Sequence, residues 1–405
     1  MRLLFVADGR SPIALNWIAY FINHKDEVHL VSTFDCKPEL DFASVHFVPV
    51  AFSQAKKNEP SRNRGKRRGG LLWSSSLVKL RTSIRRILFP LTIPTAATKL
   101  GELIAEIQPD LVHALRIPFE GIVAAQSLQG TNEPPLIISV WGNDFTLHAG
   151  ATPWMKRYTK EAIARSDGLH TDCHRDLQLA SKWGYGEDSP NIVIPGNGGI
   201  QTDIFYPPVS ESSSRSRMVI NPRGVRSYIR NDTFFASIPH VLTRLPQTKF
   251  ICLGMKGELK MEKWVEKYDI ESAVELLPNV PRKDMAELFR STAITVSPSI
   301  HDGTPNTLLE AMACGCYPIA GDLESIREWI EPGINGSLID PGDPVALAEA
   351  VINALENREL RQKSTEYNQV LISERAEYHS AMALVLEFYQ TILQNKIEGG
   401  VQPSS

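Results

Sequence analysis

Short apolar runs rich in β-branched residues alternate with helical patterns along most of the chain. In the first half these runs predict strands at residues 3–7, 28–32, 45–50, 111–114, 136–141 and 192–195. In the second half they predict strands at 218–221, 249–253, 274–277, 294–297 and 317–320. Continuous apolar strands that alternate with helices are typical of parallel sheets covered on both faces. The pattern therefore predicts an α/β protein.

A polar stretch rich in Pro and Ser, residues 207–216, separates the two halves. Because one hydrophobic core stops growing at roughly 250–300 residues, 405 residues favour two domains. We expect a first domain at 1–205, a linker at 206–217, a second domain at 218–375, and a helix at 376–398 that packs back toward the first domain. Each domain is predicted to be doubly wound and Rossmann-like, with ligands bound in a central cleft at the carboxyl ends of the strands.

Composition excludes several classes of protein. The chain is 42% apolar and 22% charged with net charge −3, which is ordinary globular usage and argues against a nucleic-acid-binding polycation. It has no run of ~18–20 apolar residues for a membrane span, and the apolar start at 1–7 is too short for a signal peptide. Five cysteines without a CxxC pair argue against disulfides and structural zinc, and indicate a cytoplasmic location.

The segment 56–90 differs from the rest, because it holds eleven Lys or Arg against one acidic residue, Glu59. Apolar residues at 73, 77, 80, 84 and 87 keep helical spacing within it. An amphipathic basic helix of this kind binds anionic membrane surfaces. The alternative is an ordinary surface helix whose apolar face packs on the core.

The stretch 298–315 carries the clearest chemistry. It follows a predicted strand, and its helix start is indicated by Thr304 as a cap and by Pro305, while Gly315 indicates the helix end. A helix start after a buried strand offers N–H groups to an anion. Asp302 and Glu310 flank this start, and carboxylates accept hydrogen bonds from sugar hydroxyls. The alternative is an acid that compensates the helix dipole and a surface glutamate.

This stretch resembles the signature of retaining GT-B glycosyltransferases of the glycosyl transferase group 1 family, in which seven residues separate an acid from a glutamate. The resemblance implies that Glu310 holds the ribose of a nucleotide and that Asp302 contacts the transferred sugar. Asp302 stands where the family usually has Glu. The backbone between the two acids would approach the sugar and phosphate, at Gly303, Thr304, Asn306 and Thr307.

Other stretches of the second half fit the same resemblance. Arg223, after a predicted strand, matches the arginine that neutralises the donor diphosphate, and the planar guanidinium suits phosphate. Arg230 is the better candidate for a second cation, with Arg226 as the alternative; both could instead be surface arginines. Val280 lies in the stretch that resembles the loop reading the nucleobase. Residues 194–200 resemble the stretch that ends the first domain.

The resemblance is weaker in the first half, where an acceptor would bind. Gly9 stands in place of a double-glycine loop that approaches the diphosphate. His113, Trp141 and Asp144 sit at predicted strand ends that line the acceptor side. Relatives often have His at the position of Trp141, so a catalytic role for that His does not carry over. His113 could equally be a core histidine, and Asp144 a helix cap.

The resemblance implies a retaining hexosyltransferase that uses a nucleoside-diphosphate sugar and a glycan or lipid-linked acceptor. We expect no metal and no cofactor, because the chain has no DxD-like site and arginines can neutralise the diphosphate. The expected location is cytoplasmic, peripheral to the membrane's inner face. Three alternatives remain: a nucleotide-sugar epimerase of the same architecture, a non-catalytic nucleotide-sugar-binding protein, and a scaffold protein that acts through its basic segment.

Overall fold

The chain folds into two compact units in a computed structural model that describes residues 1–50, 75–130, 133–209 and 215–400, with the backbone alone at 75–89, 216 and 399–400. Unit 1 comprises Met1–Asn197 and Met382–Ser405, and unit 2 comprises Gly198–Ala381. The division falls before the predicted linker at 206–217. Ile200 and Phe205 explain this difference, because both are fully buried in the core of unit 2.

Unit 1 is built on a seven-stranded parallel sheet with the order β3-β2-β1-β4-β5-β6-β7. Its strands are β1 (Arg2–Ala7), β2 (Glu27–Ser32), β3 (Ser44–Phe47), β4 (Leu111–Ala114), β5 (Leu136–Val140), β6 (Gly168–Thr171) and β7 (Asn191–Val193). β6 was not predicted from the sequence. Its polar residues His170 and Thr171 are fully buried and interrupt the apolar run.

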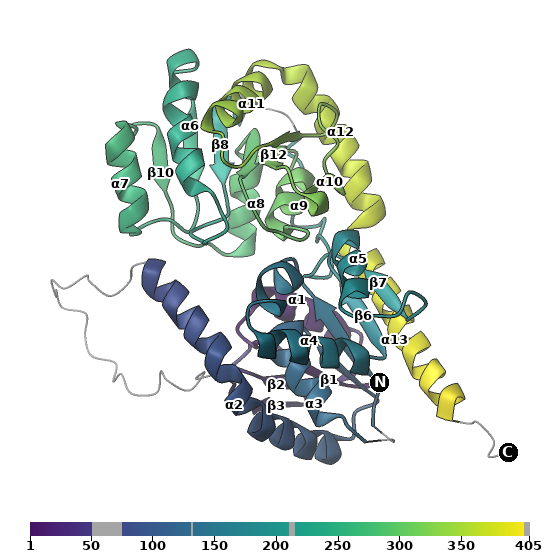
Figure 1. Cartoon of the computed structure of the whole chain (residues 1–405). Coiled ribbons are helices and arrows are strands. Elements are labelled where there is room, and N and C mark those ends of the chain that lie inside the picture. The colour runs from purple at the N-terminus through teal and green to yellow at the C-terminus, as the bar shows by residue number, and fades with distance from the viewer. Residues whose placement is uncertain (51–74, 131–132, 210–214, 401–405) are drawn as a thin grey trace. The chain divides into compact units, whose positions relative to one another are not determined.

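The helices and helical turns of unit 1 are α1 (Pro12–Asn23), α2 (Ser75–Ile107), η1 (Ile117–Gly121), α3 (Ile122–Ser127), η2 (Asp144–Ala149), α4 (Pro153–Arg165), α5 (His174–Lys182) and, from Met382 onward, α13 (Tyr378–Gly400). Figure 1 shows α13 beside β6 and β7. The contact is close, because a Cβ at Gly168 would lie 2.9 Å from the Ile392 side chain. The start of α1 is capped by Ser11, whose hydroxyl accepts from the N–H of Ala14.

A chain of hydrogen bonds runs through the core of unit 1 and ties α13 to the sheet. It joins, in order, Trp17, Tyr389, His113, Ser139, His170 and the carbonyl of Ile194. Burial lowers the pKa of both histidines, that of His170 to about 4. Because a carbonyl only accepts, neutral His170 donates from Nε2, and each earlier member then donates to the next. All donors in this chain are therefore satisfied.

Unit 2 is built on a six-stranded parallel sheet with the order β10-β9-β8-β11-β12-β13. Its strands are β8 (Met218–Asn221), β9 (Lys249–Cys252), β10 (Val274–Leu276), β11 (Ile294–Ser297), β12 (Tyr317–Gly321) and β13 (Ser337–Ile339). Its helices are η3 (Arg215–Arg217), α6 (Asn231–Arg244), α7 (Leu259–Tyr268), α8 (Arg282–Arg290), α9 (Asn306–Ala313), α10 (Glu324–Arg327), α11 (Pro344–Glu356) and α12 (Arg358–Arg375). The two parallel sheets with their helices confirm the predicted α/β class (Figure 1).

Strand order locates the place where each sheet favours a ligand. In an open α/β sheet the crevice lies at the carboxyl ends of the two neighbouring strands at which the order reverses. Those strands are β1 and β4 in unit 1, and β8 and β11 in unit 2. The loops that follow these four strands are therefore the first places to look for functional residues.

The predicted basic segment at 56–90 lies largely outside the described residues. The backbone of α2 covers part of it from Ser75, but the side chains up to residue 89 are not described. Within the described part of the chain, no helix combines the length and the apolar character needed to cross a bilayer.

The buried hydrogen-bond chain generates a prediction for stability. Tyr389→Phe leaves the ring nitrogen of His113 and the indole N–H of Trp17 without partners, which should lower the free energy of unfolding by about 1–3 kcal/mol. Urea denaturation of the full chain measures the change. Tyr367→Phe, at a 42% exposed tyrosine of α12, is the control and should leave the midpoint unchanged. Equal midpoints for the two variants would contradict the prediction.

Candidate functional site

The loop after β8 holds Arg223 in a fixed conformation. Asn221 and Asn231 are buried and hydrogen-bonded to each other at 3.0 Å. The side-chain Oδ1 of Asn221 accepts from the N–H of Arg223 at 3.1 Å, and the side-chain amide of Asn231 donates to the backbone carbonyl of Gly224 at 2.8 Å. Gly224 has φ +63°, a conformation that favours glycine. The position of Arg223 is thus set by its neighbours on both sides.

The Arg223 guanidinium reaches the residues that the sequence placed around the helix start. Nη2 lies 2.5 Å from Oδ2 of Asp302, and Nη1 donates to the hydroxyl of Thr307 at 3.0 Å. Ser299 donates to the same carboxylate oxygen at 3.0 Å. Arg223 and Asp302 are each 8% exposed. Nε of Arg223 is buried and has no hydrogen-bond acceptor among the described residues, as expected where a ligand supplies one.

Helix α9 starts one residue later than predicted, with Pro305 rather than Thr304 at the cap position. It begins at Asn306 after Pro305, and the hydroxyl of Thr304 instead accepts from the indole of Trp329 at 3.0 Å. The predicted cap is therefore wrong. The first-turn N–H groups, at Asn306 and Thr307, are those for which a helix offers no internal acceptor, so they remain suited to an anion. Gly315 follows the helix with φ +75°, which confirms the predicted end.

Glu310, the second acid of the signature, lies one turn after Thr307 and pairs with Arg282 of α8. Nη2 of Arg282 is 3.2 Å from Oε1 of Glu310, and Nη1 donates to Gln201 at 2.9 Å. Glu310 is 7% exposed. Burial raises the pKa of Glu310 to about 7, and the guanidinium opposes this rise. Arg282 was missed by the sequence analysis, although it directly follows the predicted nucleobase loop.

The two candidates for a second cation differ in their surroundings. Arg230 is held by Asp232 through two hydrogen bonds of 2.9 Å, on the exposed surface before α6. Arg226 donates to the hydroxyl of Tyr228 at 2.9 Å and interacts electrostatically with Asp302. Of the two candidates, Arg226 is thus the one with an electrostatic interaction with Asp302, while the charge of Arg230 is paired with Asp232.

The remaining donor-side candidates are placed as follows. Gly303 is buried beside Asp302. The side-chain oxygen of Asn306 is buried and has no hydrogen-bond partner in the described part of the chain. Val280 is half-buried in the loop between β10 and α8, two residues before Arg282.

In unit 1 the glycine of the first loop has a packing role. A Cβ at Gly9 would lie 2.5 Å from the sulfur of Cys36, and its N–H donates to the hydroxyl of Ser32 at 3.1 Å. That N–H is thus already used within the protein. A contact between Gly9 and the donor diphosphate stays a prediction.

His113 is a core residue and does not reach a ligand. It is fully buried, its pKa is lowered by burial, and both ring nitrogens bind Tyr389 and Ser139. The core alternative for His113 therefore describes the structure, and the acceptor-side assignment is wrong.

Asp144 and Trp141 lie in the loop after β5. Asp144 binds Arg116, a residue that was not predicted from the sequence. Asp144 is fully buried, and its carboxylate accepts from Nε of Arg116 at 2.8 Å and from the N–H of Trp141 at 3.0 Å. Asp144 is not the N-cap of a helix, a position taken by Asn143. The indole N–H of Trp141 is buried and has no acceptor among the described residues.

A buried group with metal-ligand spacing follows β6, namely Asp172, Cys173 and Asp176. Asp172 accepts from the N–H of Gly142, and burial raises the pKa of both carboxyl groups. Nη2 of Arg175 lies 2.7 Å from Oδ1 of Asp176. The guanidinium of Arg175 thus supplies, next to Asp176, the positive charge that a metal ion would supply.

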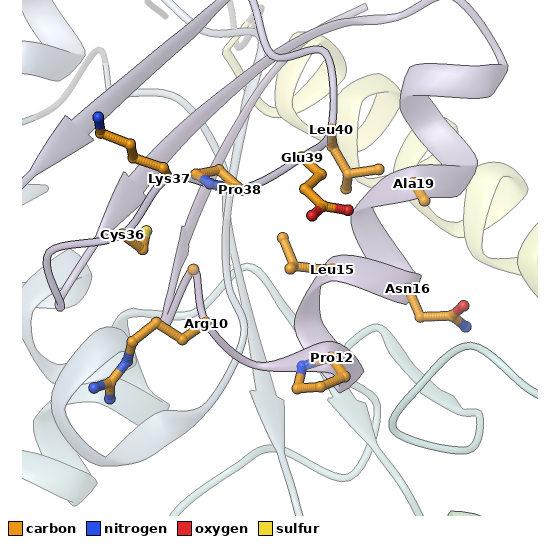
Figure 2. A pocket seen from close by; sticks show the side chains of 11 residues that line it. Arg10, Pro12, Leu15, Asn16, Ala19, Cys36, Lys37, Pro38, Glu39 and Leu40 are labelled. Carbon is orange, nitrogen blue, oxygen red and sulfur yellow. The ribbon is translucent and has the colours of Figure 1, made fainter. Parts of the chain in front are cut away.

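An open pocket of about 590 Å³ lies at the carboxyl ends of β1 and β2 in unit 1. Figure 2 shows it between α1, which carries Leu15, Asn16 and Ala19, and the segment 36–40. Gly9 and Arg10 line its edge nearest β1. Arg10 is paired with Asp8 at 2.9 Å and lies over the ring of Phe34. Apolar walls with a few polar groups are typical of small-molecule sites.

Comparison with known proteins places this fold and site in a family. Residues 214–371 match the family Glycosyl transferases group 1, and residues 74–172 match Glycosyl transferase 4-like. The fold is that of the HepE protein of Anabaena in complex with UDP, with TM-score 0.71 and 15% identity over 96% of this chain and all of that one. Sucrose-phosphate synthase of Thermosynechococcus elongatus is similar, with TM-score 0.75 and 15% identity over 98% of this chain and all of that one.

Curated relatives are similar to this chain in sequence over shorter stretches. A D-inositol 3-phosphate glycosyltransferase of Xylanimonas cellulosilytica is 24% identical over 57% of this chain and 58% of its own length. A phosphatidyl-myo-inositol mannosyltransferase of Mycolicibacterium smegmatis is 24% identical over 39% of this chain and 40% of its own length. The chain thus spans less than two thirds of either relative. It belongs to the GT-B glycosyltransferases, with a group 1 second unit and a family 4-like first unit.

The buried pair of Glu310 and Arg282 generates a pH prediction. If ionised Glu310 accepts the ribose hydroxyls, nucleotide affinity rises as pH rises through about 7, where Glu310 loses its proton. Between about pH 6 and about pH 8 the ionised fraction, and with it the affinity for UDP, should increase about tenfold. Calorimetric titration measures this. Glu310→Gln should bind weakly with a flat profile, and an unchanged slope in this variant would show that another group titrates.

Proposed function

We propose that this protein is a retaining, metal-independent hexosyltransferase. It takes a nucleoside-diphosphate sugar at unit 2 and transfers the sugar to a hydroxyl of a glycan or lipid-linked acceptor held by unit 1. The observation that carries the donor half of this proposal is the set of contacts from Arg223 to Asp302 and Thr307 at the carboxyl ends of β8 and β11.

The donor would bind with its diphosphate between Arg223 and the start of α9. Nε of Arg223 and the first N–H groups of α9 are preorganised donors for the charge that develops on the leaving diphosphate. Arg226, which interacts electrostatically with Asp302, is the second cation of the proposal. Two arginines and a helix start supply positive charge in place of a metal ion, which supports metal independence.

The two acids, Glu310 and Asp302, would bind the ribose and the transferred sugar of the donor. Glu310, held by Arg282, would accept hydrogen bonds from the ribose, and Val280 would contact the base. Asp302 would contact the transferred sugar once the diphosphate binds Arg223. Retention of configuration is supported by the acid, seven residues and glutamate spacing; in this family the donor phosphate accepts the acceptor's proton on the same face, so no general base is assigned.

The acceptor side of the proposal is supported by the pocket beside α1 and by the names of the relatives, which refer to inositol 3-phosphate and phosphatidyl-myo-inositol. The basic residues of the 56–90 segment support contact with an anionic membrane. We therefore place the protein in the cytoplasm at the inner face of a membrane, in the synthesis of a surface glycan. Trp141 and Asp144 support the acceptor side from the loop after β5.

Turnover of nucleotide sugars tests the proposal. With a panel of UDP- and GDP-hexoses, the wild type should release nucleoside diphosphate, slowly to water without acceptor and faster with one. Arg223→Gln should lower this rate about 10²–10³-fold, because it removes a charged donor from the leaving group. Arg244→Gln, which breaks an exposed ion pair with Glu356 elsewhere in unit 2, is the matched control and should retain the wild-type rate.

Two further comparisons sharpen the test. Arg226→Ala should slow turnover more than Arg230→Ala, because Arg226 interacts electrostatically with Asp302, whereas Arg230 is paired with Asp232. A panel without turnover, or an Arg223→Gln variant as fast as the control, would contradict the proposal. An epimerised sugar from donor alone would identify an epimerase instead, and addition of a chelator should leave the rate unchanged.

A further inference from the structure

The pocket beside α1 has a composition that limits what it can bind. It lies at the carboxyl ends of β1 and β2 and has a volume of about 590 Å³. Every residue that lines it belongs to unit 1. Its walls are largely apolar, and they are formed by Pro12, Leu15, Ala19, Pro38 and Leu40. Small-molecule sites are of this size, with apolar walls and a few polar groups that fix the ligand.

The wall of the pocket at residues 34–40 is held in place by the ends of β1 and β2. The hydroxyl of Ser32 donates to the carbonyl of Phe34 at 2.6 Å and accepts from the N–H of Gly9 at 3.1 Å. The thiol of Cys36 donates to the same hydroxyl at 3.4 Å. Because the wall is already ordered by these contacts, a ligand does not have to order it on binding.

Three charged side chains line the pocket, and they differ in direction. Figure 2 shows the carboxylate of Glu39 pointing toward Leu15 of α1. The side chains of Lys37 and Arg10 extend away from that helix (Figure 2). Arg10 is also paired with Asp8 at 2.9 Å. Glu39, in contrast, has no hydrogen-bond or ion-pair partner within the described part of the chain. The charge that faces the interior of the pocket is therefore negative.

A carboxylate over apolar walls selects its ligand by charge. An ionised carboxylate only accepts hydrogen bonds, and it accepts strong ones from hydroxyl groups. It repels a phosphate or a second carboxylate. A sugar or cyclitol ring has C–H faces that can pack on the apolar walls and hydroxyl groups that can donate to the carboxylate. An ammonium group would also suit the carboxylate, but the proposed reaction requires a hydroxyl.

We propose that this pocket binds an uncharged sugar or cyclitol of the acceptor, and that Glu39 accepts hydrogen bonds from its hydroxyl groups. The inference rests on the proposed function, in which unit 1 holds the acceptor. It adds that a phosphate carried by the acceptor lies outside this pocket. Inositol 3-phosphate, which occurs in the name of a curated relative, should therefore bind this pocket less well than inositol does.

Cys36 provides a direct measure of whether the pocket is occupied. It lines the pocket and is half-buried, whereas Cys173, Cys252, Cys314 and Cys316 are buried. A thiol reagent should therefore modify Cys36 first, and a ligand in the pocket should slow this reaction. Mass spectrometry of the full-length protein measures the rate with myo-inositol and methyl hexosides, and with inositol 3-phosphate and hexose 6-phosphates. An uncharged probe should protect Cys36 at a lower concentration than its phosphate does.

Two variants test the role of the carboxylate. Glu39→Gln keeps the shape of the side chain but accepts weaker hydrogen bonds, so the uncharged probe should be needed at about five to ten times the concentration. The same variant should narrow the difference between a probe and its phosphate, because the repulsion is removed. Glu106→Gln is the matched control and should behave as wild type does. Glu106 is an exposed glutamate of α2 that has no partner among the described residues.

The inference is overturned if no uncharged probe protects Cys36, if the phosphates protect it equally well or better, or if Glu39→Gln protects like the control. Modification of Cys36 requires neither donor nor turnover, so the two proposals fail in different ways. A protein that releases nucleoside diphosphate while no uncharged probe protects Cys36 contradicts the inference alone. Protection that depends on Glu39, without turnover of any nucleotide sugar, counts against the proposed function alone.

Discussion

The ion pair between Arg223 and Asp302 is the contact on which the account of unit 2 depends. Both groups are 8% exposed, so each charge needs the other in the unliganded protein. The pair also holds the loop after β8 against the start of α9, where Thr307 completes it. In the proposed function a diphosphate competes with Asp302 for the guanidinium. Its arrival would release the acid to the sugar, so that donor binding itself prepares the site.

Each unit pairs an arginine at the carboxyl end of a strand with a buried aspartate. A parallel sheet delivers side chains to one edge, but a long arginine there samples many rotamers unless it is held. Unit 2 holds Arg223 with Asp302, and unit 1 holds Arg116 with Asp144. In each case the aspartate is buried and comes from the loop after a neighbouring strand.

The sequence predicts more of the fold than of the site, for physical reasons. Buried parallel strands are apolar along their whole length, so most of them were predicted from the sequence. β6 was not predicted because it contains buried polar residues, and β13 was not predicted because it has only three residues. Arg223 was predicted because it follows a strand directly. Arg282 and Arg116 were missed, since their importance arises from acids that are distant in sequence. His113 stood at a strand end like Arg223, and only packing shows that it faces the core.

The most direct measurement of the central claim is the affinity for UDP of wild type, Arg223→Gln and Asp302→Asn, by calorimetric titration at one pH, with UMP as the reference ligand. If Arg223 binds the diphosphate and Asp302 competes for it, Arg223→Gln should lose at least about tenfold in UDP affinity and approach its affinity for UMP. Asp302→Asn should bind UDP at least as tightly as wild type. Undiminished UDP binding by Arg223→Gln would contradict the account.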